Sequence, residues 1–249
     1  MKILKRLSIA LLFSSVAAVP AAHANLILNG SFESPIVPSS SLSCGIAFNT
    51  QCQGFYSHNQ INPPVAGPFD IGAWSVVGKG GAPGVAVVMQ LGNGYTENAL
   101  RFDAQDGAQS LDLTGEGNQG ANGIKQSIAT VIGGHYFLSF YLGREDPLAP
   151  GYEIGPSALD LILNQDAPVN FVATATVAND IAWTQFTYGF TATAAMTTIA
   201  FLNATGVGNN FAGVDNVDLE AIPEPASLAL LGLGLSGLFL LRRRKSAAA

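Results

Sequence analysis

Apolar and polar residues alternate in short runs along most of the chain after residue 84. In the run 136–142 apolar side chains stand at every second position, and the runs 159–163 and 183–190 repeat the pattern. A period of two is that of a strand with one buried face, and long segments of 3.6-residue period are missing. The predicted strands are residues 26–28, 74–77, 85–89, 110–113, 123–131, 136–142, 159–163, 171–177, 183–190, 199–201 and 214–219, with a hairpin-type break at Gly133-Gly134.

Turn residues separate these runs at regular intervals, which predicts an all-β fold, an antiparallel β-sandwich or jelly roll. We assign residues 25–221 to one domain, because the length suits one large β domain and no internal repeat or boundary divides it. Within it, residues 36–83 are rich in Pro, Ser and Gly. That stretch is long for a connection in a compact domain, so an irregular, surface-bound loop insertion is predicted there.

The first 24 residues have the pattern of a secretory signal peptide. Lys2, Lys5 and Arg6 precede an apolar stretch, residues 7–19, and Ala22-His23-Ala24 is an A-x-A cleavage site. The mature chain is therefore expected to begin at Asn25, after export through the inner membrane.

Residues 222–249 form a second targeting segment. The triplet Pro223, Glu224 and Pro225 precedes an uncharged apolar run, residues 226–241, and a basic cluster of Arg242, Arg243, Arg244 and Lys245. A helix over that run would be roughly 24 Å long, short for a bilayer core of about 30 Å but able to span a thinned membrane. The basic cluster is expected to stay on the cytoplasmic side. A plain C-terminal membrane anchor is one interpretation.

The triplet, the short hydrophobic helix and the basic cluster together resemble the PEP-CTERM sorting signal of Gram-negative bacteria. The resemblance implies processing by an exosortase, a membrane transpeptidase, near the triplet. The tail would hold the protein in the inner membrane before processing. The cell surface or the extracellular matrix is the expected destination.

The charge of the body excludes some partners. Residues 25–221 contain four Lys or Arg and 16 Asp or Glu, a formal charge of −12. Nucleic acid is therefore not an expected partner, because binding phosphates requires clustered basic residues. An acidic exported body does suit Ca²⁺, which prefers carboxylate and carbonyl oxygens.

Cys44 and Cys52 are the chain's two cysteines. In an exported protein, two cysteines this close in sequence favour one local disulfide. It would add about 2–3 kcal/mol of stability in the chain-entropy model. A redox or metal pair is the alternative, but it lacks a C-x-x-C spacing and a His cluster.

Three stretches of the body are similar to galactose-binding-domain-like jelly rolls, found in carbohydrate-binding modules and in "choice-of-anchor" surface proteins. The stretches are NLILNGSFE from residue 25, SLDLTGEGNQGANGIKQSIATVIGGHYFLSFYLG from residue 110, and AWTQFTYGFTATAAMTTIAFLNAT from residue 182 followed by GVDNVDLE. The resemblance implies a structural Ca²⁺ where the first and last strands meet, held by Glu33, Asp215 and carbonyls near Ser31. Alternatively, Glu33 is an exposed carboxylate and Asp215 a turn residue.

Sugar binding needs exposed aromatic faces with polar neighbours. Trp74, Tyr95 and Tyr152 are the predicted ligand-binding residues, and the two tyrosines lie in Gly-rich loops, where binding residues concentrate. Core packing is the alternative for Trp74, and Trp183 is expected to be buried. The mature body has two histidines, His58 and His135, and no recognisable catalytic motif.

These observations predict a non-catalytic surface or matrix protein, associated with exopolysaccharide or biofilm and binding extracellular polysaccharide weakly. One alternative is an extracellular glycan-active enzyme of the glycoside hydrolase kind, which should place two carboxylates in an aromatic-lined cleft. Another is a self-assembling surface protein without a ligand.

Overall fold

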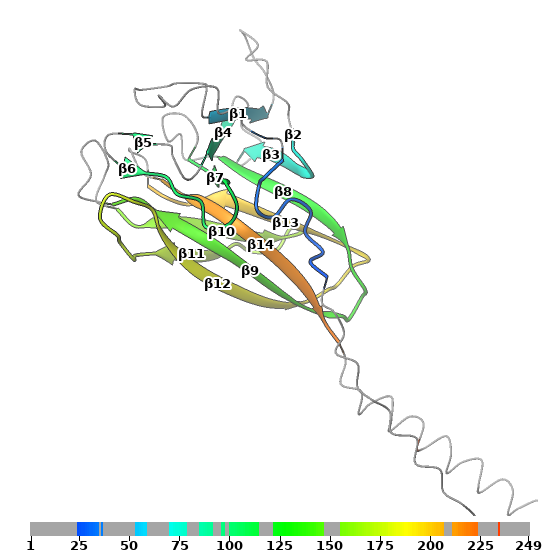
Figure 1. Ribbon diagram of the computed structural model, residues 1–249. Helices are drawn as coiled ribbons and strands as arrows, with labels where there is room; N and C mark the ends of the chain where they lie inside the picture. Colours follow the sequence, from blue (N-terminus) through cyan, green and yellow to red (C-terminus); the bar gives the residue numbers. More distant parts are fainter. Residues whose placement is uncertain are drawn as a thin grey trace, which may run out of the picture.

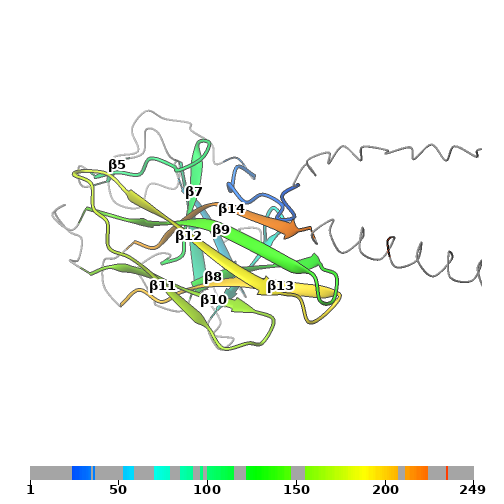
Figure 2. The same ribbon diagram turned by 90° about the horizontal axis from the view of Figure 1, so that it is seen from below.

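Two antiparallel sheets stack face to face in the computed structural model (Figure 1, Figure 2). It describes residues 24–34, 36, 53–58, 70–78, 85–91, 96–97, 100–114, 122–146, 155–206, 211–223 and 234. The strands are β1 (Gln53–His58), β2 (Asp70–Ile71), β3 (Trp74–Gly78), β4 (Val85–Leu91), β5 (Thr96–Glu97), β6 (Leu100–Arg101), β7 (Gln109–Asp112), β8 (Asn122–Ala129), β9 (His135–Arg144), β10 (Ser157–Leu163), β11 (Val169–Ala173), β12 (Ala182–Thr191), β13 (Met196–Asn203) and β14 (Gly213–Ile222).

The first sheet has the strand order β1-β4-β7-β14-β9-β12, and the second has the order β11-β10-β13-β8-β3-β2. A short pair, β5-β6, stands apart from both. Every pairing is antiparallel. The predicted antiparallel β-sandwich is therefore confirmed.

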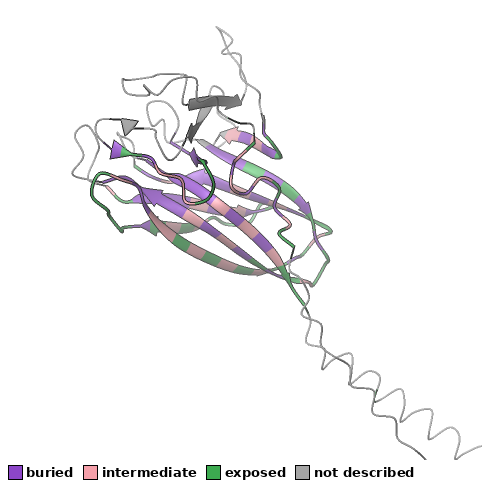
Figure 3. Cartoon of the chain, viewed as in Figure 1, coloured by how far each residue is buried: buried purple, intermediate pink, exposed green. Residues whose placement is uncertain are grey.

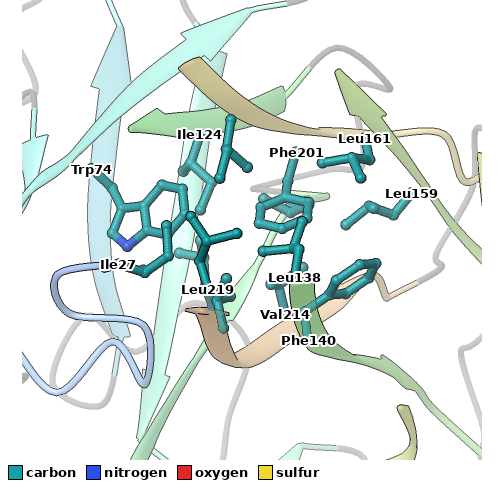
Figure 4. Packing of buried hydrophobic residues seen from close by; sticks show 14 of the residues in the cluster. Ile27, Trp74, Ile124, Leu138, Phe140, Leu159, Leu161, Phe201, Val214 and Leu219 are labelled. Atoms are coloured by element: carbon teal, nitrogen blue, oxygen red, sulfur yellow. The ribbon is translucent and has the colours of Figure 1, made fainter. Parts of the chain in front are cut away.

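The alternating residues of the long strands meet between the two sheets, as the stripes of buried and exposed positions in Figure 3 show. Leu138 and Phe140 of β9 face Leu159 and Leu161 of β10 and Phe201 of β13 in the other sheet (Figure 4). Leu142 of β9 and residues of the neighbouring strand β14 belong to the same core. Burying one large apolar side chain stabilises a fold by about 1.5–3 kcal/mol. The pattern that predicted the strands is thus also what holds the sheets together.

Trp74 belongs to this core and is 0% exposed. Its ring packs against Phe32 and Phe201, with centroid distances of 5.8 and 6.0 Å. Its Nε1 donates a hydrogen bond to the carbonyl of Asn29 at 3.0 Å. The prediction that Trp74 binds a ligand is wrong, because no face of its ring reaches solvent.

Other sequence predictions need correction. The stretch 36–83 contains two strands that the sequence did not predict, β1 and β2, in addition to β3 at the predicted residues 74–77. Residues 174–177 lie outside β11, which ends at Ala173. The turn at Gly133-Gly134 does not close a hairpin, because β8 and β9 belong to different sheets.

The first residues of the body do not form the predicted strand either. The side chain of Asn25 replaces ladder bonds there: its Oδ1 accepts from Ile27 N at 2.8 Å and from Leu219 N at 3.0 Å. The Gln126 amide bonds both backbone groups of Leu28, at 2.9 Å each. Side chains therefore fix this segment beside β14, so the two ends of the body lie together (Figure 1).

Candidate functional sites

A loop of residues 105–109 is held between two carboxylates from opposite ends of the sequence. Glu33 Oε1 accepts from Ala108 N at 2.7 Å and from Gln109 N at 2.8 Å. Asp215 Oδ2 accepts from Gln105 N and Asp106 N, both at 2.9 Å. The structure thus brings the two predicted calcium ligands to one loop.

The contacts of Asp215 bear on whether a cation could bind at this loop. Its side chain is fully buried, and its Oδ1 accepts from Asn216 N at 2.7 Å. Burial raises the pKa of Asp215 to about 7, and the amide hydrogen bonds oppose that rise. The described residues contain no group of three or more His, Cys, Asp or Glu placed to hold a metal ion. The backbone N–H groups account for the positions of the Asp215 and Glu33 carboxylates without a metal ion. Calcium held by Glu33, Asp215 and carbonyls near Ser31 therefore stays a prediction.

The outward side of the first sheet forms a second candidate site, beside the same loop. Three rows of paired residues cross β14, β9 and β12: Glu220–Phe137–Gly189, Asp218–Ser139–Thr187 and Asp215–Tyr141–Gln185. We call the set the outer face, made up of Phe137, Ser139, Tyr141, Gln185, Thr187, Gly189, Asp218 and Glu220. Paired residues point to the same side of a sheet, and the alternate positions of β9 fill the core.

Phe137 supplies the apolar part of the outer face. Its side chain is 42% exposed, between the acidic Glu220 and the bare backbone of Gly189. A Cβ on Gly189 would meet nothing closer than the Tyr136 carbonyl oxygen at 3.9 Å, so packing does not require glycine. A strand-interior glycine without a packing reason often marks the close approach of a ligand. Phe137 and Gly189 therefore form a flat, open platform.

Asp218 supplies the polar part. Its Oδ1 is buried and has no hydrogen-bond partner. Partial burial, with the neighbouring charge of Glu220, raises the pKa of Asp218 above its usual value. The β-bulge between Asp215 and Asp218, where Asn216 has a φ of 47°, turns Asp218 onto the same side as Phe137. The polar part of the outer face is thus a half-buried carboxyl group beside the aromatic platform.

One end of the outer face is closed by a small hydrophobic cluster of Leu100, Phe102, Ile181 and Phe211, with Trp183 packed against it. Trp183 lies on Gly143 and Gly213, where a Cβ would come within 2.8 and 2.9 Å of its ring. Its Nε1 donates to the Asp103 carbonyl at 2.9 Å. Trp183 is half-buried and serves packing, close to what the sequence predicted.

A groove of about 260 Å³ opens next to the outer face, along the free edge of β12. Its lining includes Tyr188, Phe190, Asn164, Asp166 and Thr191. Among the described residues that line the groove, Asp166 is the one carboxylate.

The remaining predicted site residues lie outside the described part of the chain. They are Tyr95, Tyr152, Cys44, Cys52, Glu224, Pro225, Arg242, Arg243 and Arg244, together with the signal peptide up to residue 23. Among the described residues, no helix is both long and apolar enough to cross a membrane. The predicted span over residues 226–241 is not among them.

Sequence reasoning missed Phe137, Tyr141 and Asp218. A signal was present: in a run whose even positions fill the core, two aromatic residues occupy odd positions, 137 and 141. An aromatic side chain at a position that the alternation assigns to solvent is a stronger pointer to a surface site than a tyrosine in a glycine-rich loop.

Comparison with known proteins identifies the tail. Residues 221–245 match the PEP-CTERM protein-sorting motif, so the chain is an antiparallel β-sandwich that carries a PEP-CTERM sorting motif at its C-terminal end. A search of curated proteins found no match.

The body is similar in fold to solved carbohydrate-binding domains. They include a putative sugar binding protein from Bacteroides thetaiotaomicron (12% identity, 80% of this chain and 100% of that chain, TM-score 0.46). A CBM4 structure has 17% identity over 79% of this chain and 99% of its own, with a TM-score of 0.37. The CBM22-1 xylan-binding domain from Paenibacillus barcinonensis Xyn10C has 12% identity over 69% and 94%, with a TM-score of 0.38.

Proposed function

We propose that this chain is an exported, exosortase-sorted surface or matrix protein whose body binds extracellular polysaccharide without acting on it. The outer face carries the proposal. An exposed aromatic ring, an open glycine position beside it and the neighbouring acidic side chains of Asp218 and Glu220 are the kinds of group that hold a sugar ring and its hydroxyl groups.

The openness of the outer face favours binding over catalysis. Asp218 and Glu220 are two residues apart on one strand, on one side of the sheet, next to Phe137. This pair is the observation that favours the alternative, a glycan-active enzyme. The outer face, however, is open. The two acids whose pKa values burial raises to about 7, Glu145 and Asp215, are buried and out of reach of a substrate. An extended polysaccharide lying across three strands fits such an open face.

Phe137→Ala is expected to weaken polysaccharide binding roughly tenfold, because a stacked ring contributes on the order of 1.4 kcal/mol. Affinity electrophoresis measures it, in gels containing the producing cells' own extracellular polysaccharide and, separately, soluble β-glucan, xylan or galactan. Val172→Ala is the matched control: Val172 is also 42% exposed, on β11 of the other sheet. Equal retardation of both variants argues against the outer face. Release of new reducing ends, lost in Asp218→Asn, favours the enzyme.

The tail makes a separate prediction. Protein recovered from the cell surface or medium is expected to end near residues 223–225, because processing near the triplet removes the apolar run and the basic cluster. Intact mass and C-terminal peptide mapping measure this. A surface protein that still ends in the basic cluster is an ordinary membrane-anchored protein, and the sorting proposal then fails while the binding proposal stands.

A further inference from the structure

The end of the sandwich from which the tail leaves carries a group of exposed apolar side chains. Val131 is 71% exposed, Ile132 68%, Met196 52% and Ile222 49%. We call these four residues the apolar tip. Soluble surfaces normally carry large apolar residues singly, and a contiguous group marks an interaction site.

Hydrogen bonds hold the turns of the apolar tip together. The turn between β8 and β9 is bonded to the turn between β12 and β13: Thr130 N donates to the Ala195 carbonyl at 2.9 Å and Gly133 N to the Ala192 carbonyl at 2.8 Å, while Ala192 N donates to the Gly134 carbonyl at 2.9 Å. Ile222 pairs with His135, the residue that follows the first turn. Both views of the fold place these turns and the end of β14 at one end (Figure 1, Figure 2). The tip is thus a fixed surface.

The length of chain beyond Ile222 identifies what this surface meets. Three residues, Pro223 to Pro225, separate Ile222 from the predicted membrane run that starts at Ala226. Even when fully extended, that connection spans at most about 14 Å. The headgroup layer on each side of a bilayer core is roughly 5–8 Å thick. A body tethered this closely cannot hold its tethered end far from the lipid.

Charge is consistent with the same orientation. The two turns, residues 130–134 and 192–195, contain no charged residue, although the body as a whole has a formal charge of −12. An acidic surface is repelled by anionic lipid, whereas an uncharged apolar surface partitions into the interface. The body therefore meets the membrane most favourably with its apolar tip.

We propose that, before the tail is processed, the apolar tip rests in the lipid interface and holds the outer face upright and clear of the bilayer. The inference rests on the proposed role of the tail as a membrane segment. It assigns the tip to lipid, rather than to the folded-back tail or to a second copy of the chain.

The test uses the full chain reconstituted in phosphatidylethanolamine–phosphatidylglycerol vesicles whose acyl chains are brominated close to the headgroup. Bromine quenches tryptophan on contact. Ile132→Trp and, as a second position, Met196→Trp place a reporter in the tip. Val177→Trp is the matched control, because Val177 is an exposed valine in the loop at the opposite end of the sandwich. Trp74 and Trp183 contribute the same background to every variant.

The expected result is at least twofold stronger bromolipid quenching at positions 132 and 196 than at position 177. Quenching equal to the control, with the reporter open to aqueous acrylamide, overturns the proposal, since the body then stands off the membrane. A reporter shielded from both quenchers also overturns it and indicates that protein covers the tip. Flotation of the vesicles distinguishes a failure of the tip proposal from a failure of the tail proposal. A chain that does not float with the vesicles refutes the membrane role of the tail as well.

Discussion

Trp74→Ala is expected to lower the free energy of unfolding by roughly 3–5 kcal/mol, the usual cost of removing a large aromatic side chain from a core. The indole joins parts of the fold that are far apart in sequence. It contacts Phe32, near the start of the body, and Phe201 of β13, which in turn packs on Phe140 of β9 at a centroid distance of 5.0 Å. Its removal also deprives the Asn29 carbonyl of a hydrogen-bond donor.

Urea unfolding of the mature body measures this effect. Trp74→Phe is expected to lose less than the alanine variant, since it keeps an aromatic ring and gives up the Nε1 bond and part of the volume. Val177→Ala, at an exposed position, serves as the surface control and should stay within about 0.5 kcal/mol of the parent. A loss below about 1 kcal/mol for Trp74→Ala would contradict the position of the indole in the core and reopen its assignment to a binding surface.

The strands could be predicted from the sequence because period-two alternation is a local property. Positions 136–142 and 159–163 show it without reference to any other part of the chain. Which strands pair is not local. The turn at Gly133-Gly134 has the residues of a hairpin, yet it passes from one sheet to the other, because β9 finds its partners in β12 and β14 and β8 finds its partners in β3 and β13.

The candidate sites, too, combine features that are local in the sequence with features that depend on strand pairing. The resemblance groups Glu33 and Asp215 as calcium ligands, which stays a prediction. What the structure shows is that both carboxylates accept hydrogen bonds from the backbone N–H groups of residues 105–109, a loop that no spacing rule addresses. Phe137, Asp218 and Gly189 come from three strands, and only the register places them side by side. A β-bulge decides the side on which Asp218 emerges. Such a site becomes visible once pairing is known.

Glu145→Gln is expected to remove a large part of the pH dependence of the protein's stability. Glu145 is 1% exposed, and its Oε2 accepts from Phe211 N at 2.8 Å. Its Oε1 has no hydrogen-bond partner. Burial raises the pKa of Glu145 from 4.5 to about 7; the nearby charge of Asp112 adds to the rise, while the Phe211 amide and Arg144 oppose it.

The direction of the effect follows from the proton balance of the two states. Below about pH 4 the carboxyl is protonated whether the chain is folded or unfolded. Between pH 4.5 and about 7 the unfolded chain releases its proton while the folded chain keeps it, so the free energy of unfolding falls as pH rises. Above about pH 7 both states are ionised and the loss is complete. At ~1.4 kcal/mol per pKa unit, the total loss is about 3 kcal/mol.

Because glutamine does not titrate, the variant should lack this contribution. The expected result is that the difference in unfolding free energy between Glu145→Gln and the parent moves by about 3 kcal/mol in favour of the variant from about pH 4 to about pH 8. Urea titrations in EDTA measure it, so that the predicted calcium plays no part. Asp215, whose pKa burial also raises to about 7, remains in both proteins and leaves a common slope that cancels in the comparison. Curves that stay parallel across this range would show that Glu145 is already ionised in the folded protein well below neutral pH. The carboxylate would then need a positive partner or solvent at Oε1.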